Sequence, residues 1–204
     1  MSEFREDISF YTYPQYLNLV SSLVEEGSTT GDEPTESRIA FTKLNLQRMN
    51  RWDRQLILDQ KLVSEAQHAP KQVWWVFIEA WCGDGAQSLP VLEKIAASSL
   101  GSIQLRLLLR DEHANLMTPY LTNGGKAIPK LVATDLSGEE LFTWGPRPKP
   151  AQELMSEWRR APAGRSFEDI EKELHLWYAR NKGASVQQEI LAKLNALSAV
   201  GAVG

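Results

Sequence analysis

The residues best suited to chemistry lie in the segment Glu79-Ala80-Trp81-Cys82-Gly83-Asp84-Gly85, which contains the only cysteine of the 204-residue chain. An apolar run from Val73 to Ile78 precedes the segment and predicts a buried strand, and apolar residues recur at helical spacing after it. We therefore expect Cys82 at the start of a helix, where free backbone N–H groups and the helix dipole stabilise a thiolate. Asp84 acts in the opposite direction, because a nearby carboxylate disfavours the ionised thiol. The sequence leaves open which effect prevails.

The elements that position this segment follow an α/β order. A second strand is predicted over residues 103–109, a short helix over 115–121 and a turn at Asn123-Gly124-Gly125. Residues 130–134 and 140–144 read as a hairpin across Leu136-Ser137-Gly138. A strand, a helix, a strand, a hairpin and a final helix are typical of a mixed sheet covered by helices.

Helical patterns flank this central part. Thr12 is expected to cap a first helix that ends at Gly27, and a longer helix is predicted from about Glu36 to about Ala66. After the hairpin, helices are predicted over 150–160, from a capping box at Ser166 to Gly183, and from Ser185 onward. Arg48, Arg51 and Arg54 recur on one side of the long helix and are interpreted as a solvated face.

A set of residues in register resembles the thioredoxins. Trp81-Cys82-Gly83-Asp84-Gly85 is similar to their Trp-Cys-Gly-Pro-Cys motif, and Pro90 matches the proline of their active-site helix. Ile128-Pro129 matches the isoleucine and cis-proline beside the active-site cysteine, and Gly138 and Gly145 fall at or near glycines of the final hairpin. The resemblance spans about residues 71–158. The whole chain also resembles a group of bacterial thioredoxin-like proteins with a Trp-Cys-Gly-Asp motif and a Gly-Pro-Arg-Pro turn.

This resemblance implies a thioredoxin-like three-layer α/β/α sandwich with a mixed sheet and with N- and C-terminal helical extensions. The implied division is an N-terminal extension over residues 1–70, the thioredoxin-like domain over 71–160 and a C-terminal extension over 161–204 packed on the core.

Two departures from the family limit the chemistry. Gly85 stands where thioredoxins place their resolving cysteine, and Val76 stands where they bury an aspartate that helps proton transfer. Without a second cysteine, a mixed disulfide on Cys82 cannot be released within the chain. A two-cysteine thioredoxin cycle is excluded.

The resemblance places the candidate site at the ends of neighbouring strands. The catalytic candidates are Cys82, Trp81, Asp84 and Pro129. The binding candidates are Gly83, Gly85, Arg110, Asp111, Lys126, Ile128, Trp144, Gly145 and Arg147. Three of these, Arg110, Lys126 and Arg147, are expected to form a positive rim for the carboxylates of a small thiol, and Trp81 an aromatic wall.

Two functions remain open at this stage. The first is single-cysteine thiol-disulfide exchange through a mixed disulfide at Cys82, with glutathione or another low-molecular-weight thiol as co-substrate and no resident cofactor. The second is a non-catalytic module that holds an extended peptide or protein partner in the cleft beside Pro129. An iron–sulfur role is supported by one ligand only.

Simpler interpretations stand beside these hypotheses. Arg110 and Asp111 are as readily an ion pair that closes a strand end, and residues 145–150 a rigid proline-rich turn. The three histidines, His68, His113 and His175, show no metal-ligand spacing, and no metal site is predicted. Most of the seven tryptophans are expected in the core.

The composition argues against partners that bind by bulk attraction. With 22 basic and 26 acidic side chains interleaved, the formal charge of −4 favours neither nucleic acid nor an anionic membrane. The charged start of the chain and the absence of a long apolar run predict a cytoplasmic protein. The apolar stripes of the flanking helices fit packing on the core or a homodimer.

Overall fold

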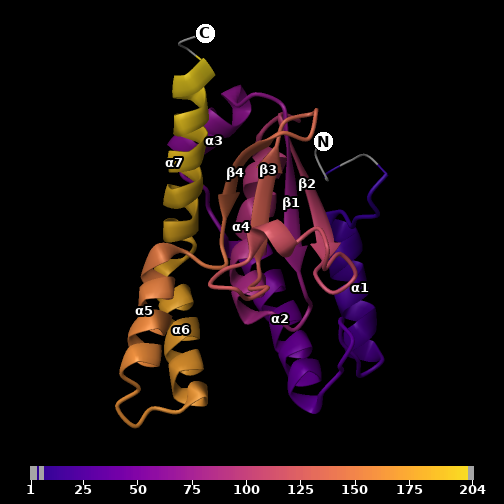
Figure 1. The fold of residues 1–204 in the computed structure, drawn as a ribbon, viewed down its shortest axis with the longest axis vertical. Helices are drawn as coiled ribbons and strands as arrows, with labels where there is room; N and C mark the ends of the chain where they lie inside the picture. The colour runs from indigo at the N-terminus through magenta and orange to yellow at the C-terminus, as the bar shows by residue number, and fades with distance from the viewer. Residues whose placement is uncertain (1–3, 5–6, 202–204) are drawn as a thin grey trace.

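The computed structural model describes residues 4 and 7–201 and forms a four-stranded mixed sheet surrounded by helices (Figure 1). In chain order the elements are α1 Tyr13–Glu25, α2 Glu36–Gln55, α3 Gln60–His68, β1 Gln72–Ile78, α4 Gly83–Ser98, β2 Ile103–Leu109, the 3₁₀ turn η1 Thr118–Tyr120, β3 Lys130–Thr134, β4 Glu140–Trp144, α5 Lys149–Arg160, α6 Phe167–Asn181 and α7 Ala184–Gly201. None of the helices in this described part is long and apolar enough to cross a membrane.

The sheet has the strand order β2-β1-β3-β4, with β1 parallel to β2 and antiparallel to β3. The parallel pair is joined through α4, whereas β3 and β4 form the predicted hairpin. All seven residues of β1 are buried, including Val76, which pairs with Leu107 on one side and Leu131 on the other. The expected thioredoxin-like α/β fold with a mixed sheet is confirmed. The strand β1 lies inside the sheet, between β2 and β3.

Helices cover the sheet unequally. The helix α4 packs along α2 and against α3, α1 lies beside β2, and α7 contacts α3 and β4. In Figure 1 the pair α5 and α6 extends below α7 and away from the sheet. This pair has its own small apolar cluster, which contains Met155, Ile170, Leu174 and Tyr178.

Local capping signals account for several helix starts. Thr12 and Gln15 form a capping box at α1, and Ser166 and Asp169 form another at α6. Cys82 occupies the N-cap position of α4, so this helix begins where the sequence predicts. These features depend on residues three positions apart, and the sequence is sufficient to find them.

The single long helix predicted from Glu36 to Ala66 is wrong. The chain leaves the helical conformation at Leu56, and Asp59 caps the separate helix α3 by accepting from the backbone N–H of Lys61 at 2.8 Å. The break is held by distant groups: Gln187 of α7 accepts from the Asp59 N–H at 2.8 Å and donates to the Ile57 carbonyl at 3.3 Å. The helical pattern of the sequence gives no sign of this contact, because Gln187 is far away along the chain.

The helix predicted over residues 115–121 is shorter in the structure than expected. Only Thr118–Tyr120 forms a 3₁₀ turn, preceded by a series of turns from Asp111. The following turn at Asn123 and Gly124 is present, with both residues at positive φ and a bridge between Thr122 and Gly125. This irregular segment leads from β2 into the loop before Pro129.

Candidate functional site

Cys82 lies in the angle between the end of β1 and the start of α4. Its Sγ accepts a hydrogen bond from the backbone N–H of Gly85 at 3.3 Å, as an N-cap side chain does. The same sulfur lies 3.3 Å from the carbonyl oxygen of Ile128, to which the thiol donates its proton. The side chain is buried, with 7% of its surface exposed. The sulfur therefore has both a donor and an acceptor within the protein.

This environment favours the protonated thiol. Burial raises the pKa of Cys82 to about 12, and the negative charge of Asp84 adds to the increase. The Gly85 N–H and the positive charges of Arg147 and Arg110 lower the pKa but do not cancel the effect of burial. The competition that the sequence left open is thus decided mainly by desolvation, which the sequence does not show.

Asp84 is held by two residues from later in the chain. Arg147 binds one carboxylate oxygen through both Nε, at 3.0 Å, and Nη2, while the Tyr178 hydroxyl donates to the other oxygen at 2.7 Å. All three side chains are largely buried. Arg147, which we expected in a positive rim, is therefore committed to Asp84 and to Gln152, whose Oε1 lies 3.4 Å from Nη1.

The loop before β3 closes the other side of the thiol. The Ile128–Pro129 peptide bond is cis, and so is Gly145–Pro146. Gly145 has φ +108°, and a Cβ atom placed on it would lie 2.3 Å from the Pro129 carbonyl oxygen. The turn after β4 therefore approaches the backbone at Pro129 as closely as a glycine allows. This contact joins the two proline turns next to Cys82.

Gly85 is also closely surrounded. A Cβ atom at this position would lie 2.1 Å from Cδ1 of Ile78 and 3.5 Å from Sγ of Cys82. The side chain of a resolving cysteine would point at the sulfur, but Ile78 occupies its space. The absence of a second thiol is thus accompanied by core packing that fills the volume such a side chain would need.

Trp81 forms a second group of contacts on the adjoining surface. The guanidinium groups of Arg38 and Arg110 lie 4.7 and 5.0 Å from its ring centroid. Arg110 also pairs with Asp111 at 2.7 Å and donates to the carbonyl of Lys126 at 3.4 Å. The ion pair that the simpler interpretation expected is present, and it leaves Arg110 stacked on the aromatic wall.

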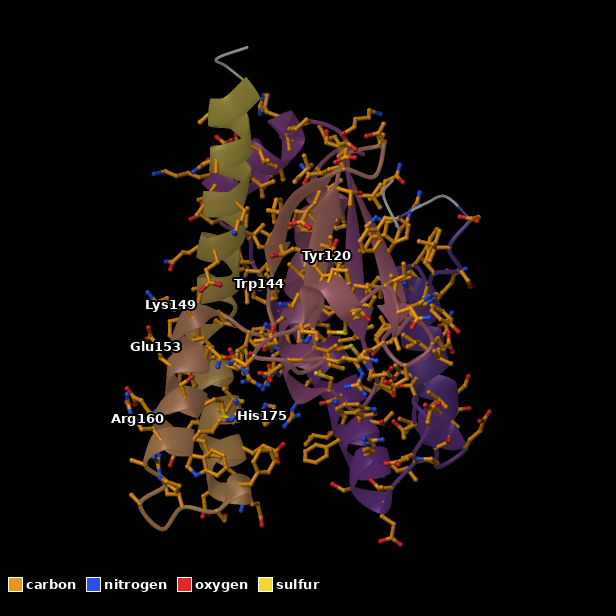
Figure 2. The ribbon with its side chains drawn as sticks, viewed as in Figure 1. Tyr120, Trp144, Lys149, Glu153, Arg160 and His175 are labelled. Carbon is orange, nitrogen blue, oxygen red and sulfur yellow. The ribbon has the colours of Figure 1, made fainter. Side chains whose placement is uncertain are left out.

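The side chains of two predicted binding residues, Trp144 and Lys126, make none of these contacts. Trp144 is buried in β4, and its indole N–H donates to Glu189 of α7 at 2.7 Å (Figure 2 labels Trp144). Lys126 is exposed and participates through its backbone carbonyl. Of the proposed positive rim, only Lys126 has a side chain without an ionic partner among the described residues.

The structure adds residues that sequence reasoning did not find. Tyr178 and His175 come from α6, Gln87 from α4, and Arg38 and Arg48 from α2. His175 lies over the start of α4, because a Cβ atom on Gly83 would be 2.8 Å from its Cε1. Arg48 belongs to the arginine stripe that we interpreted as solvated, yet it is half-buried and donates to Asn45 at 2.8 Å. No local signal distinguishes these residues from ordinary helix surface.

No group of three or more metal-ligating side chains gathers anywhere in the described part of the chain. The chemistry available at the site is that of a single buried thiol, a neutralised carboxylate and the backbone beside Pro129.

A parallel β1-α4-β2 unit followed by a hairpin, with a cysteine at the helix start facing a cis-proline, defines a thioredoxin-fold protein. Comparison with known families agrees, because a family model described as thioredoxin matches residues 31–159. The chain belongs to this thioredoxin family.

Two solved structures resemble the whole fold. A protein of unknown function from Pseudomonas aeruginosa has 16% identity and a TM-score of 0.57, with 91% of this chain and 98% of that chain covered. An HIV epitope scaffold has 18% identity and a TM-score of 0.55, with 86% and 97% covered. No curated protein matches the chain. These likenesses establish the fold alone.

Proposed function

We propose that this protein is a thioredoxin-fold binding module that holds an extended peptide segment of a protein partner beside Pro129, without catalysing thiol-disulfide exchange. The observation that carries the proposal is the state of Cys82. Its thiol is 7% exposed and donates to the Ile128 carbonyl, and its pKa is raised to about 12. A protonated thiol is a poor nucleophile, so this geometry serves packing better than attack.

The backbone beside the thiol supports peptide binding. The Ile128 N–H makes no hydrogen bond to any described residue, whereas the neighbouring Ala127 N–H donates to Gly125 at 2.9 Å. An unpaired backbone donor next to an exposed loop is the group that an added strand engages. Lys126, exposed in the same loop, supplies a positive charge for an acidic side chain of the partner.

A second function is favoured by a different observation. The Gly85 N–H and the charges of Arg147 and Arg110 all stabilise the ionised form of Cys82. If they prevail when a ligand binds, the thiolate attacks a disulfide, forms a mixed disulfide on Cys82 and releases one thiolate of the substrate. A small thiol, such as glutathione, must then attack the substrate-derived sulfur of this mixed disulfide, so that a new disulfide is released and Cys82 leaves as the thiolate, because the chain has no other cysteine.

The rate of Cys82 alkylation measured against pH distinguishes the two functions. The binding proposal expects slow reaction at pH 7 and a midpoint well above the ordinary value of roughly 8.5. Asp84→Asn should lower that midpoint, because it removes the nearby negative charge, whereas the matched variant Asp111→Asn should leave it unchanged. Rapid alkylation at pH 7 with a midpoint below neutrality would overturn the binding proposal and support exchange.

Peptide binding itself is tested with peptides selected from a random peptide display library on the full chain. Selected peptides should bind Cys82→Ser as tightly as the original protein, and the Ile128 amide should become protected from hydrogen exchange on binding. The Gly124 amide, in the same loop but away from the thiol, serves as the control. Peptides that bind only through a disulfide to Cys82, or that leave Ile128 unprotected, would contradict the proposal.

A further inference from the structure

A cavity of about 730 Å³ lies between α2 and α6, outside the contacts around Pro129. Its walls carry apolar side chains from both helices, notably Phe41 and Leu44 from α2 and Phe167 from α6. Leu44 and Phe167 are 40% and 59% exposed, so the apolar walls are open to solvent. A smaller cavity of about 290 Å³ shares Leu44, Arg48 and His175 with the first and extends it toward α4. Figure 2 shows His175 on the side of α6 that faces α2.

The tautomer of His175 is fixed by a chain of hydrogen bonds. The Trp52 indole N–H can only donate, and it donates to Oε1 of Gln87 at 2.7 Å. The Gln87 amide nitrogen must therefore be the donor to Nδ1 of His175, 3.2 Å away. Burial and the charge of Arg48 lower the pKa of His175 to about 4, so the ring is neutral near pH 7. With Nδ1 accepting, the proton of the neutral ring is on Nε2.

This Nε2–H is an unused donor on a residue that lines the cavity. It donates to no described residue. A Cβ atom on Gly83 would lie 2.9 Å from Nε2 of His175 and 3.5 Å from Nη1 of Arg48. The two donors thus converge beside the first residue of α4, where free backbone N–H groups add partial positive charge. Glycine at position 83 leaves room for this convergence.

Arg48 brings a positive charge that the protein leaves without a close counter-ion. Its Nη1 donates to the neutral amide oxygen of Asn45 at 2.8 Å, and no described carboxylate is within ion-pair distance of it. Of the carboxylates on the cavity wall, Glu168 is paired with Lys172 at 2.7 Å, and Glu171 acts on Arg48 only at longer range. A half-buried cation in this state is complementary to a ligand anion.

We propose that this cavity binds a small amphipathic carboxylate, such as a medium-chain fatty acid. Its carboxylate accepts from His175 Nε2–H and from Arg48, and its chain lies along Phe41, Leu44 and Phe167. The site is distinct from the proposed peptide site, because its walls are formed by α2 and α6 and not by the loop before β3. It joins the helix pair α5–α6 to the thioredoxin core through a ligand.

Calorimetric titration of the full chain with decanoate, below its micellar concentration, tests the proposal. One-site saturable binding is expected, and decanol, which has the same chain but no charge, should bind at least about tenfold more weakly, as expected for a lost charged hydrogen-bonding group. Arg48→Gln should weaken decanoate binding by a similar factor. Arg54→Gln, which removes an exposed charge from the same helix, should leave binding unchanged.

Leu44→Asp keeps the test decisive if Arg48→Gln fails to fold, because Leu44 is a partly exposed side chain on the cavity wall. The introduced charge should repel the carboxylate and weaken binding by an amount comparable to the loss of the Arg48 charge. Absence of saturable binding to the original protein overturns the proposal. So does binding that both Arg48→Gln and Leu44→Asp leave unchanged, or decanol binding as tight as that of decanoate.

Discussion

The Tyr178 hydroxyl donates a 2.7 Å hydrogen bond to the carboxylate of Asp84, across 94 positions of sequence and with both residues buried. This bond connects α6 to the first turn of α4. Asp84, which raises the pKa of Cys82, is thus held by the helix pair α5 and α6. The apolar cluster of this pair is otherwise separate from the main core.

Tyr178→Phe should therefore destabilise the protein by about 1–3 kcal/mol, because the buried Asp84 oxygen loses its donor. Urea denaturation followed by tryptophan fluorescence measures the change. Tyr11→Phe is the control, since the Tyr11 hydroxyl has no hydrogen bond to a described residue. Equal stability of the two variants would show that the bond to Asp84 contributes little.

Gly145→Ala should be strongly destabilising. The added Cβ would meet the backbone oxygen of Pro129 at 2.3 Å, and backbone cannot move aside as a flexible side chain does. Gly101→Ala is a matched control, because Gly101 also has a positive φ but has no atom within 4 Å of the position that the added methyl group would occupy. We expect Gly145→Ala to lose about 2 kcal/mol or more beyond the loss of the control. Thermal unfolding of both variants provides the comparison.

A cysteine introduced at position 85 should form a disulfide with Cys82 readily only when the side chain of Ile78 is shortened. Gly85→Cys alone directs its Cβ to within 2.1 Å of Ile78 Cδ1, the atom that valine lacks. The double variant Gly85→Cys with Ile78→Val should readily form a disulfide between Cys82 and the introduced thiol, since the new Cβ is 3.5 Å from that of Cys82. Free-thiol titration under oxidising conditions compares the two, with Ile78→Val as the control. Equally rapid oxidation of the single variant would show that Ile78 is no obstacle.

His175 should make the protein sensitive to mild acid. Its pKa in the folded state, about 4, is below the value of 6.5 in the unfolded chain. The unfolded chain therefore takes up a proton first as pH falls. The stabilising contribution of neutral His175 to the free energy of unfolding is therefore fully present above about pH 6.5. It is lost as the pH falls from 6.5 to 4, and the loss approaches a limit of about 3 kcal/mol.

Denaturation midpoints measured across this pH range test the assignment. His175→Gln should show a smaller loss of stability between pH 6.5 and pH 4 than the original protein. His68→Gln, which changes an exposed histidine, should keep the full pH dependence. Parallel curves for the original protein and His175→Gln would assign the sensitivity to other groups.

The sequence by itself determined the elements that depend on neighbouring residues. The apolar run of β1, the hairpin of β3 and β4, the helix cap at Thr12 and the capping box at Ser166 were all predicted, because each signal lies within a few residues of the structure it produces. The position of Cys82 at the start of α4 followed from the same local pattern.

Only the tertiary structure decided how those elements act on the site. The helix break near Leu56 depends on Gln187, which is 128 positions beyond Asp59. The pKa of Cys82 is raised mainly by burial and then by Asp84, and its thiol donates to the Ile128 carbonyl, 46 positions away. Asp84 is in turn held by Arg147 and Tyr178. Desolvation and long-range hydrogen bonds are properties of the packed molecule, so a residue's type and spacing reveal that a thiol is present but not whether it is ionised.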